Sequence, residues 1–132
     1  ADRVLSMQSL TVQSEMVPWN RVSCIGIDVP LQRRSEMLQT SSYTRIPAVN
    51  SKGNIRGILP VLSVLLQPNE PTDRLILEPL FLTPTTNVQD ALHQLRESGK
   101  AMAIVSNDGQ SPLGIVTLKD LVEPLVGELA AW

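Results

Sequence analysis

Hydrophobic and polar positions along this chain change between a strand-like and a helix-like spacing. Short apolar or alternating runs predict strands, and apolar residues that recur on one helical face predict helices. Strands are expected over residues 21–27, 45–49, 55–59, 79–82, 101–105 and 113–116. Helices are expected over 30–40, 60–66, 87–98 and 118–129, after a lead-in helix or connector over 3–10. The pattern therefore predicts a fold of the α/β (α+β) class.

Polar and special residues support several of these limits. Asn87 suits an N-cap and Gly99 suits a helix end. Turns are predicted at 50–53 and 107–109, each between two strands. Pro124 lies inside the last predicted helix, which we expect it to kink or interrupt.

A sequence echo at an offset of 57 residues divides the chain into two similar copies. Gly57–Ser63 aligns with Gly114–Asp120, and Leu38 aligns with Leu95. Each copy is predicted to run strand, helix, strand, strand, helix, and repeats of this size complete a core by packing together. The predicted division is a lead-in over 1–20, a first copy over 21–67, a linker over 68–78 and a second copy over 79–132.

The two copies carry different chemistry at the end of the aligned segment. The second copy has Thr117 and Asp120 where the first copy has Pro60 and Ser63. If the copies bind a ligand, their two sites are therefore expected to be unequal.

The composition is that of a soluble globular protein with an aliphatic core. Hydrophobic residues make up 42% of the 132 residues, and aromatic residues make up only 3%. The net charge of −2 argues against a general nucleic-acid binder, because phosphate contacts need clustered Lys and Arg. The one dense basic spot, Arg33-Arg34, is predicted to be a solvated helix face.

Cysteine content and hydropathy limit the class further. Cys24 is single, so the chain can form no intramolecular disulfide, and we interpret this residue as a small buried hydrophobe. No metal-ligand spacing is present. The longest apolar run, Ile58–Leu66, is far shorter than the roughly 20 residues that span a bilayer. We therefore interpret the sequence as a cytosolic piece of a longer protein.

Thr117 and Asp120 follow a predicted strand and begin the last predicted helix. The start of a helix presents backbone N–H groups and the positive end of its dipole, which suit an anion. A hydroxyl there can contact phosphate, and a carboxylate three residues later can accept hydrogen bonds from a ribose diol. The same Thr-x-x-Asp spacing also forms a capping box, in which both side chains satisfy the helix's own N–H groups. These residues alone favour the structural interpretation.

A polar cluster, Tyr43–Pro47, lies between a predicted helix end and a strand of the first copy. Arg45 offers a planar cationic fork for phosphate, Thr44 a hydroxyl, and Tyr43 a flat face or a hydrogen bond. Taken alone, Arg45 is better explained by a surface salt bridge. Because the second copy has the less polar Lys100–Ile104 at this offset, the polar sets of the two copies complement one another. We hypothesise that they face each other across a pseudo-twofold cleft and build one site.

No residue set in the sequence indicates catalysis. His93 has no second His or nearby Cys and is predicted to be exposed. No Ser/His/Asp or Cys/His set can be assembled, and neither a P-loop nor a G-x-G-x-x-G motif is present. The chain is therefore not expected to be an enzyme, and no catalytic residue is assigned.

The repeated order of elements, with Thr-x-x-Asp after the last strand, resembles the tandem cystathionine-β-synthase (CBS) domain pair, or Bateman module. More specifically, the chain resembles the pair found in magnesium and cobalt efflux proteins of the CorC/HlyC type and their animal cyclin-M relatives. The segments that carry the resemblance are Tyr43–Pro47, Leu80–Pro84, Ala103–Val105, Leu113–Glu123 and Val126–Glu128.

The resemblance implies two β-α-β-β-α units, related by a pseudo-twofold axis and packed sheet to sheet, in a pair that forms homodimers. It implies an adenine nucleotide as ligand, either ATP, accompanied by magnesium, or AMP. Thr117 would then meet phosphate or ribose, Asp120 the ribose hydroxyls and Arg45 the phosphates. The other implied pocket residues are Tyr43, Thr44, Ile46 and Pro47, with the main chain of Met16–Pro18 and Ser23–Ile25 at the base edge.

Three functions are compatible with the sequence. The first is a non-catalytic module that senses adenine nucleotide, tethered to the inner face of the membrane through its parent transporter, whose membrane domain is its partner. The second is a structural dimerisation module without a ligand, for which Val17, Pro60, Ser63 and Lys119 argue because they depart from the family pattern. The third is the regulatory pair of a soluble enzyme that binds AMP or S-adenosylmethionine.

Overall fold

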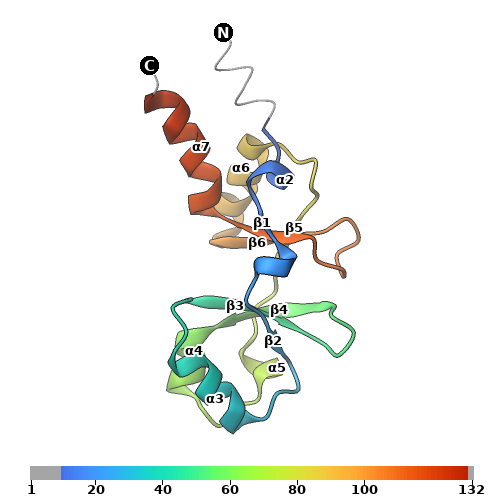
Figure 1. Ribbon diagram of the computed structural model, residues 1–132, viewed down its shortest axis with the longest axis vertical. Helices are drawn as coiled ribbons and strands as arrows, with labels where there is room; N and C mark the ends of the chain where they lie inside the picture. Colours follow the sequence, from blue (N-terminus) through green and yellow to red (C-terminus); the bar gives the residue numbers. More distant parts are fainter. Residues whose placement is uncertain (1–9, 131–132) are drawn as a thin grey trace. The chain divides into compact units, whose positions relative to one another are not determined.

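The computed structural model describes residues 10–130, so almost all of the predicted lead-in over 3–10 lies outside the described residues. The chain forms two compact units, both drawn in Figure 1. Unit 1 combines the N-terminal segment through Val22 with the chain from Leu80 onward, and unit 2 spans Ser23–Pro79. The second sequence copy thus folds together with the segment that precedes the first copy.

Unit 2 is built on a three-stranded sheet of order β2-β3-β4. Strands β2 and β3 are parallel, and β3 and β4 are antiparallel. The strands are β2 (Ile25–Gly26), β3 (Arg45–Val49) and β4 (Ile55–Pro60), and the helices are α3 (Leu31–Gln39), α4 (Val61–Leu66) and α5 (Thr72–Leu75). Its core is the predicted aliphatic one, with Ile25, Leu38, Ile46, Ala48, Leu59, Val61, Val64 and Leu75 buried together.

Unit 1 is built on a four-stranded sheet of order β1-β7-β6-β5. The strands are β1 (Val17–Pro18), β5 (Leu80–Leu82), β6 (Met102–Val105) and β7 (Gly114–Thr117). The helices are α2 (Val12–Glu15), α6 (Val88–Ser98) and α7 (Leu118–Ala130), with a 3₁₀ turn, η1 (Trp19–Arg21), after β1. Its core holds Val12, Leu82, Val88, Ala91, Leu95, Ala103, Val105, Val116 and Leu121.

Helix α6 shows why these elements form where the sequence predicts them. The Asn87 side chain accepts a 2.8 Å hydrogen bond from the Asp90 N–H, so it caps the first turn as predicted. Gly99 ends the helix in the left-handed region, at φ 70°. Val88, Ala91 and Leu95 share the buried face between these two ends.

The sequence repeat is also a repeat of strand register. Arg45 lies opposite Pro60 in the β3–β4 pair, and 57 positions later Met102 lies opposite Thr117 in the β6–β7 pair. The elements run β2-α3-β3-β4-α4 in unit 2 and β5-α6-β6-β7-α7 in unit 1. The predicted mixed class with two β-α-β-β-α units is therefore confirmed.

Each unit is completed by a short segment that the hydropathy pattern does not predict. In unit 1, β1 pairs antiparallel with β7, and Val17 lies opposite Ile115. In unit 2, the main chain of Leu77 exchanges hydrogen bonds of 2.8 and 2.9 Å with Ile58. Because Ile58 and Ile115 are 57 positions apart, α2-β1 and the α5–Leu77 segment are equivalent parts of the two units. The second of these lies in the segment that was predicted to be only a linker.

Two local predictions are wrong, and a third is wrong in part. The strand expected over 21–27 is confined to Ile25–Gly26, because only these residues pair with β3. Cys24 therefore falls outside the strand and is exposed rather than buried. The last helix runs through Pro124 to Ala130, so Pro124 does not interrupt it, whereas the kink that was the other expected effect stays a prediction. None of the described helices is both long and apolar enough to cross a membrane.

The prediction of a solvated Arg33-Arg34 face is wrong for Arg34, which is fully buried. Its Nη1 donates to the Glu70 carbonyl oxygen at 2.8 Å and to the Thr72 hydroxyl at 2.9 Å, and its Nη2 donates to the Pro68 carbonyl oxygen at 3.2 Å. These acceptors explain how unit 2 tolerates a cation in its interior. Arg33 is exposed, as predicted.

Candidate functional site

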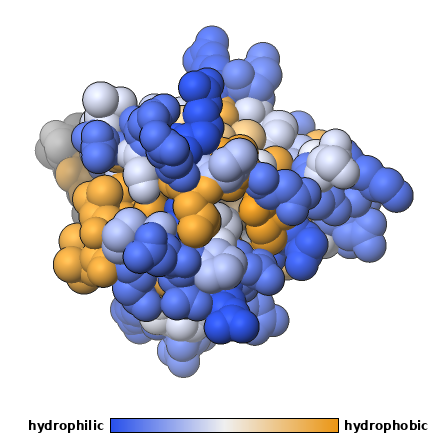
Figure 2. Space-filling model, turned by 90° about the horizontal axis from the view of Figure 1, so that it is seen from below, coloured by the Kyte–Doolittle hydropathy of each residue, from blue (hydrophilic) through white to orange (hydrophobic). Residues whose placement is uncertain are grey.

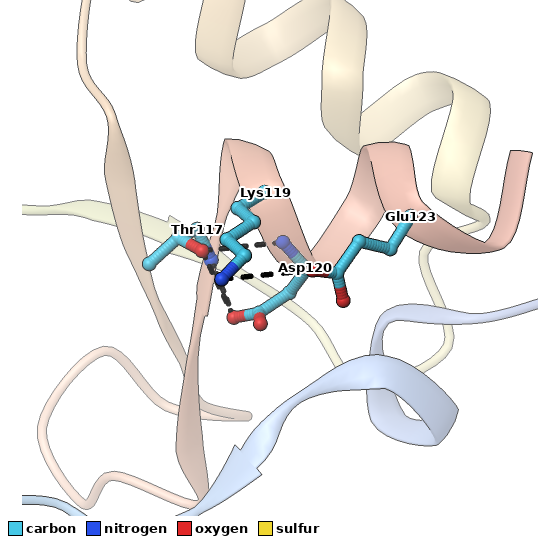
Figure 3. A network of polar contacts seen from close by, with 4 residues as sticks. All are labelled: Thr117, Lys119, Asp120 and Glu123. Atoms are coloured by element: carbon cyan, nitrogen blue, oxygen red, sulfur yellow. Dashed lines mark hydrogen bonds and ion pairs between the residues drawn. The ribbon is translucent and has the colours of Figure 1, made fainter. Parts of the chain in front are cut away.

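Thr117 and Asp120 lie together where β7 ends and α7 begins (Figure 3). Asp120 Oδ2 accepts hydrogen bonds from the Thr117 N–H at 3.1 Å and from the Thr117 hydroxyl at 3.0 Å. The Asp120 N–H in turn donates to Thr117 Oγ1 at 3.2 Å. The structural interpretation of Thr-x-x-Asp is thus satisfied, because the two side chains cap the start of α7 reciprocally.

This cap limits what the site can offer to an anion. The Leu118 N–H donates to the Ala101 carbonyl oxygen at 3.1 Å, and the Asp120 N–H is taken by Thr117. Two donors of the first turn are therefore used inside the chain. The Thr117 hydroxyl proton is also committed, to Asp120 Oδ2. A phosphate therefore finds fewer free donors here than an uncapped helix start would give.

The cap also leaves one good acceptor in place. Within the described residues, Asp120 Oδ1 accepts no hydrogen bond, and the carboxylate is only half-buried. The bonds to Oδ2 hold the carboxylate in one orientation. A preoriented carboxylate oxygen accepts hydrogen bonds from hydroxyl groups well, so the arrangement suits a diol better than a phosphate.

Lys119 does not enter this network. Its Nζ lies 3.7 Å from Glu123 Oε1, one turn along α7, and 82% of its side-chain surface is exposed. An ion pair as exposed as this contributes little to stability. The positive charge of Lys119 is therefore balanced by Glu123 on an exposed part of α7.

The main chain of β1 flanks the strand that carries Thr117. Pro18 lies opposite Gly114, and Val17 lies opposite Ile115. A Cβ at Gly114 would meet the Val17 carbonyl oxygen and would lie 2.7 Å from Met16 Sδ. The structure thus brings the predicted Met16–Pro18 segment against β7, and only glycine at position 114 permits that approach.

The first-copy cluster is on unit 2, at the start of β3. Tyr43 and Arg45 are exposed, and Arg45 Nη1 lies 3.4 Å from Thr44 Oγ1. The Thr44 carbonyl oxygen accepts the first N–H of α4, from Val61, at 3.0 Å. Three polar side chains are therefore available to solvent on a main chain fixed by β4 and α4.

The two apolar members of that cluster have a different environment. Ile46 and Pro47 are buried, and Ile46 belongs to the unit 2 core. Their side chains hold β3 in place. Of the predicted segment Ser23–Ile25, Ile25 likewise packs in the core, whereas Ser23 and Cys24 are exposed.

The position equivalent to the Thr117–Asp120 cap lacks such a network in unit 2. Pro60 precedes α4 without a side-chain cap. Ser63 replaces the carboxylate, and within the described part of the chain its side chain makes no hydrogen bond. The predicted inequality of the two copies therefore extends to the geometry of these helix starts.

No other residue cluster competes with these two. Among residues 10–130 no group of three or more His, Cys, Asp and Glu could hold a metal ion. His93 is exposed and lies 4.0 Å from Glu97. Partial burial raises the pKa of the Cys24 thiol, which disfavours the reactive thiolate.

Two residues have structural roles that the sequence analysis did not assign. Asp108 accepts hydrogen bonds from the Gln110 and Ser111 N–H groups at 2.9 Å, and these bonds lower the pKa of its carboxyl. An Asp within a polar turn is a sequence signal for such a role. For the burial of Arg34 the sequence holds no such signal, because two adjacent arginines indicate an exposed helix face.

The family model described as CBS domain matches residues 74–127. A UPF0053 protein of Mycoplasma pneumoniae is 28% identical over 133 residues, which cover 96% of this chain and 31% of that protein. An uncharacterized protein of Mycobacterium tuberculosis is 31% identical over 113 residues, covering 83% of this chain and 33% of that protein. The chain thus spans about a third of the length of these two curated relatives.

Solved structures show the same fold. The CBS domain of a bacterial CNNM/CorC family Mg²⁺ transporter in complex with ATP has a TM-score of 0.84 and 22% identity, covering 96% of this chain and 94% of that one. A CBS-domain pair from Klebsiella pneumoniae with bound AMP has a TM-score of 0.80 and 22% identity, covering 89% and 99%.

Proposed function

We propose that this chain, which is similar to the CBS domain of a CNNM/CorC family Mg²⁺ transporter, is a non-catalytic regulatory module that binds an adenine nucleotide. The observation that carries the proposal is the Asp120 carboxylate, which α7 and Thr117 hold in one orientation with Oδ1 unpaired among the described residues. A nucleotide offers the matching group in its ribose diol.

The proposed roles follow from what each side chain can donate or accept. Asp120 Oδ1 accepts from the ribose hydroxyls. Thr117 acts mainly by orienting Asp120, because its hydroxyl proton is already donated to that carboxylate. Arg45, which is exposed and always charged, takes the phosphates together with Thr44. Tyr43, 54% exposed, supplies a face on which a base can stack.

Among adenine nucleotides we propose ATP as the ligand of this chain and AMP as the weaker one. Structural neighbours with ATP and with AMP support the class. ATP is favoured because Arg45 is a phosphate fork, whereas the start of α7 is largely capped by its own side chains. Magnesium would be held chiefly by the phosphates, as is usual for this ion.

The proposed nucleotide-binding residues come from both units. Asp120 belongs to unit 1 and Arg45 to unit 2. The nucleotide would act through its differential affinity for two states of the module, on the order of 1–3 kcal/mol. The signal would pass to the remainder of a parent membrane transporter, with this module on the cytosolic side.

Calorimetric titration of this chain with ATP, ADP and AMP, each with and without magnesium, tests the proposal. Saturable binding that weakens from ATP to AMP is expected. Asp120→Asn should weaken binding by about tenfold, because it removes the charge but keeps an oxygen for the cap. Arg45→Ala should reduce the preference for ATP over AMP. Equal affinities for ATP and AMP in the wild-type chain would contradict the role of Arg45.

The second candidate function, a dimerisation scaffold without a ligand, is supported by exposed apolar residues on unit 2. Leu62, Leu65 and Leu66 of α4 are 64%, 49% and 72% exposed. Figure 2 shows apolar surface interrupting the polar surface on the face that it displays. Patches of this kind mark interaction sites in soluble proteins. A homodimer is therefore part of both candidate functions.

Sedimentation velocity and the nucleotide titration distinguish the regulatory module from the dimerisation scaffold. Leu66→Lys should shift a dimer towards monomer, whereas Gln67→Lys, which adds the same charge one residue later, should not. A dimer that gives flat heats with every nucleotide, from folded protein, would favour the scaffold. Binding of AMP or S-adenosylmethionine without ATP binding would favour the regulatory pair of a soluble enzyme.

A further inference from the structure

Arg34 lies where unit 1 has no charged residue. The equivalent position in unit 1 is Ala91, and both residues are fully buried. The one side-chain acceptor of Arg34 among the described residues is Thr72, the first residue of α5. The equivalent of Thr72 in unit 1 is Val12, the first residue of α2. A polar pair in unit 2 thus replaces an apolar pair in unit 1.

This replacement changes how the equivalent segments are attached. In unit 1 main-chain hydrogen bonds attach the segment. The Val12 N–H donates to the Thr86 carbonyl oxygen at 2.8 Å, and the Val88 N–H donates to the Leu10 carbonyl oxygen at 3.0 Å. In unit 2 the equivalent of Leu10 is Glu70, whose carbonyl oxygen accepts instead from Arg34 Nη1. Between the described residues 27–31 and 70–73 no backbone hydrogen bond forms.

In unit 2 a pocket lies at the place where unit 1 has these main-chain hydrogen bonds. Its volume is about 300 Å³, and it is lined in part by Ile27, Leu31 and Thr72. Arg34 therefore holds the 68–72 segment from inside, through three hydrogen bonds of one side chain, while a solvent-accessible pocket reaches the same segment from outside.

The attachment is also incompletely satisfied. Arg34 Nε is buried and, among the described residues, has no hydrogen-bond partner. A buried donor without a partner costs free energy, and so does a buried cation. Both costs are relieved when the segment leaves and water reaches the guanidinium.

We propose that Arg34 is a latch, and that residues 68–76 detach from unit 2 as a local opening whose equilibrium Arg34 sets. The segment lies between α4, which ends at Leu66, and β5, which begins at Leu80. Its release lengthens the free chain that joins the two units while the β3–β4 pair stays formed. The proposal does not rest on nucleotide binding.

Amide hydrogen exchange on the whole chain tests the latch. The Arg74 and Ile76 N–H groups bond within the segment, to Pro71 and Thr72, and the Met16 N–H makes the equivalent bond to Val12 in unit 1. In the wild-type chain, Ile76 is expected to exchange about tenfold or more faster than Met16, after correction for intrinsic rates.

Arg34→Met keeps an unbranched side chain and removes all three hydrogen bonds. It should raise exchange at Arg74 and Ile76 by about tenfold to a hundredfold and leave the β3–β4 amides unchanged. Arg33→Met is the matched control, because Arg33 is the exposed neighbour on the same helix, and it should change neither. If Arg34→Met does not fold, Thr72→Val removes one acceptor at nearly constant volume and should raise exchange several-fold at the same amides.

Two results would overturn the latch. A uniform rise across unit 2, β3–β4 amides included, would make Arg34 an ordinary part of the core. Unchanged exchange at Ile76 in a folded Arg34→Met or Thr72→Val variant would show that these hydrogen bonds do not hold the segment.

Discussion

Unit 1 and unit 2 share a strand register, residue for residue at an offset of 57, yet they place different chemistry on it. At the end of the last strand, unit 1 has the reciprocal Thr117–Asp120 cap and unit 2 has Pro60 and Ser63. In the interior, unit 1 buries Ala91 where unit 2 buries Arg34. The two copies thus share one backbone pattern and differ in the side chains that they place on it.

The two units also differ in their polar side chains and in how their equivalent segments are attached. Unit 1 has the preoriented Asp120 carboxylate, and its α2-β1 segment is held by main-chain hydrogen bonds. Unit 2 has the exposed cationic fork. Its 68–77 segment is held by the Arg34 side chain, by Leu75 in the core and by the main-chain hydrogen bonds between Leu77 and Ile58. Unit 1 is thus the half with the preoriented carboxylate, and unit 2 is the half in which a buried arginine attaches the 68–72 segment.

The glycines at the repeat give the largest expected effect. Gly114→Ala should lower the free energy of unfolding by about 3 kcal/mol, because its Cβ would meet the Val17 carbonyl oxygen of β1. Gly57→Ala should cost about 2 kcal/mol, because its Cβ would lie 2.9 Å from Ile76 Cβ and from the Leu77 carbonyl oxygen.

Urea denaturation of the two variants measures these costs. Gly26→Ala is the control, since its Cβ would lie at an ordinary 3.5 Å from Val29 Cγ2, and it should change the free energy of unfolding by less than about 0.5 kcal/mol. Small and equal losses of unfolding free energy in the Gly57 and Gly114 variants would contradict this account. They would show that the α5–Leu77 and α2-β1 segments do not pack closely against β4 and β7.

Helix caps give an intermediate effect. Asn87→Ala should destabilise unit 1 by about 1 kcal/mol, because the Asp90 N–H loses its partner. Asn107→Ala is the matched control at an exposed asparagine and should stay within about 0.5 kcal/mol in thermal unfolding. The equivalent helix of unit 2, α3, begins at Leu31 after Pro30, which provides no side-chain cap, so unit 2 has no equivalent hydrogen bond to lose. Equal losses from the two asparagines would remove this difference between the units.

The smallest effect concerns pH. Asp108 holds the 106–111 turn of unit 1, and its pKa is lowered by the Gln110 and Ser111 N–H groups. Its contribution is therefore complete above the ordinary carboxyl pKa and is lost as the pH falls through the lowered value. In unit 2, Asn50 Oδ1 binds the Lys52 and Asn54 N–H groups and does not titrate.

An NMR titration from pH 6 to pH 2 compares the two turns. The Gln110 and Ser111 amide signals should move with the Asp108 carboxyl, and those of Lys52 and Asn54 should move much less. Parallel shifts in both turns would point to a general change in the fold.

The sequence predicts the elements whose signals are local. Helix α6 has a capping asparagine, a spaced apolar face and a terminal glycine, so its limits follow from the chain alone. Elements of two to four residues, such as β1 and α5, exist only because distant strands pair with them or pack on them. Periodicity cannot detect these elements, and the strand expected over 21–27 was overextended for the same reason.

The candidate site was predicted to a similar degree. The Thr-x-x-Asp spacing alone predicted that Thr117 and Asp120 interact. The structure adds that the cap uses Asp120 Oδ2 and leaves Oδ1 without a hydrogen bond among the described residues. Burial of Ile46 and Pro47 was not evident from a cluster that is otherwise polar. Arg34 could not be predicted at all, because its acceptors lie 34 to 38 positions away along the chain.

The inequality of the two copies is tested most directly by titrating ATP into the wild-type chain, Ser63→Ala and Asp120→Ala, with folding of each variant checked by circular dichroism. We predict one nucleotide per chain for the wild-type chain and Ser63→Ala with the same affinity, and a loss of about tenfold or more for Asp120→Ala. Equal losses in both variants, or unaltered binding in Asp120→Ala, would contradict the assignment of the site to the second copy.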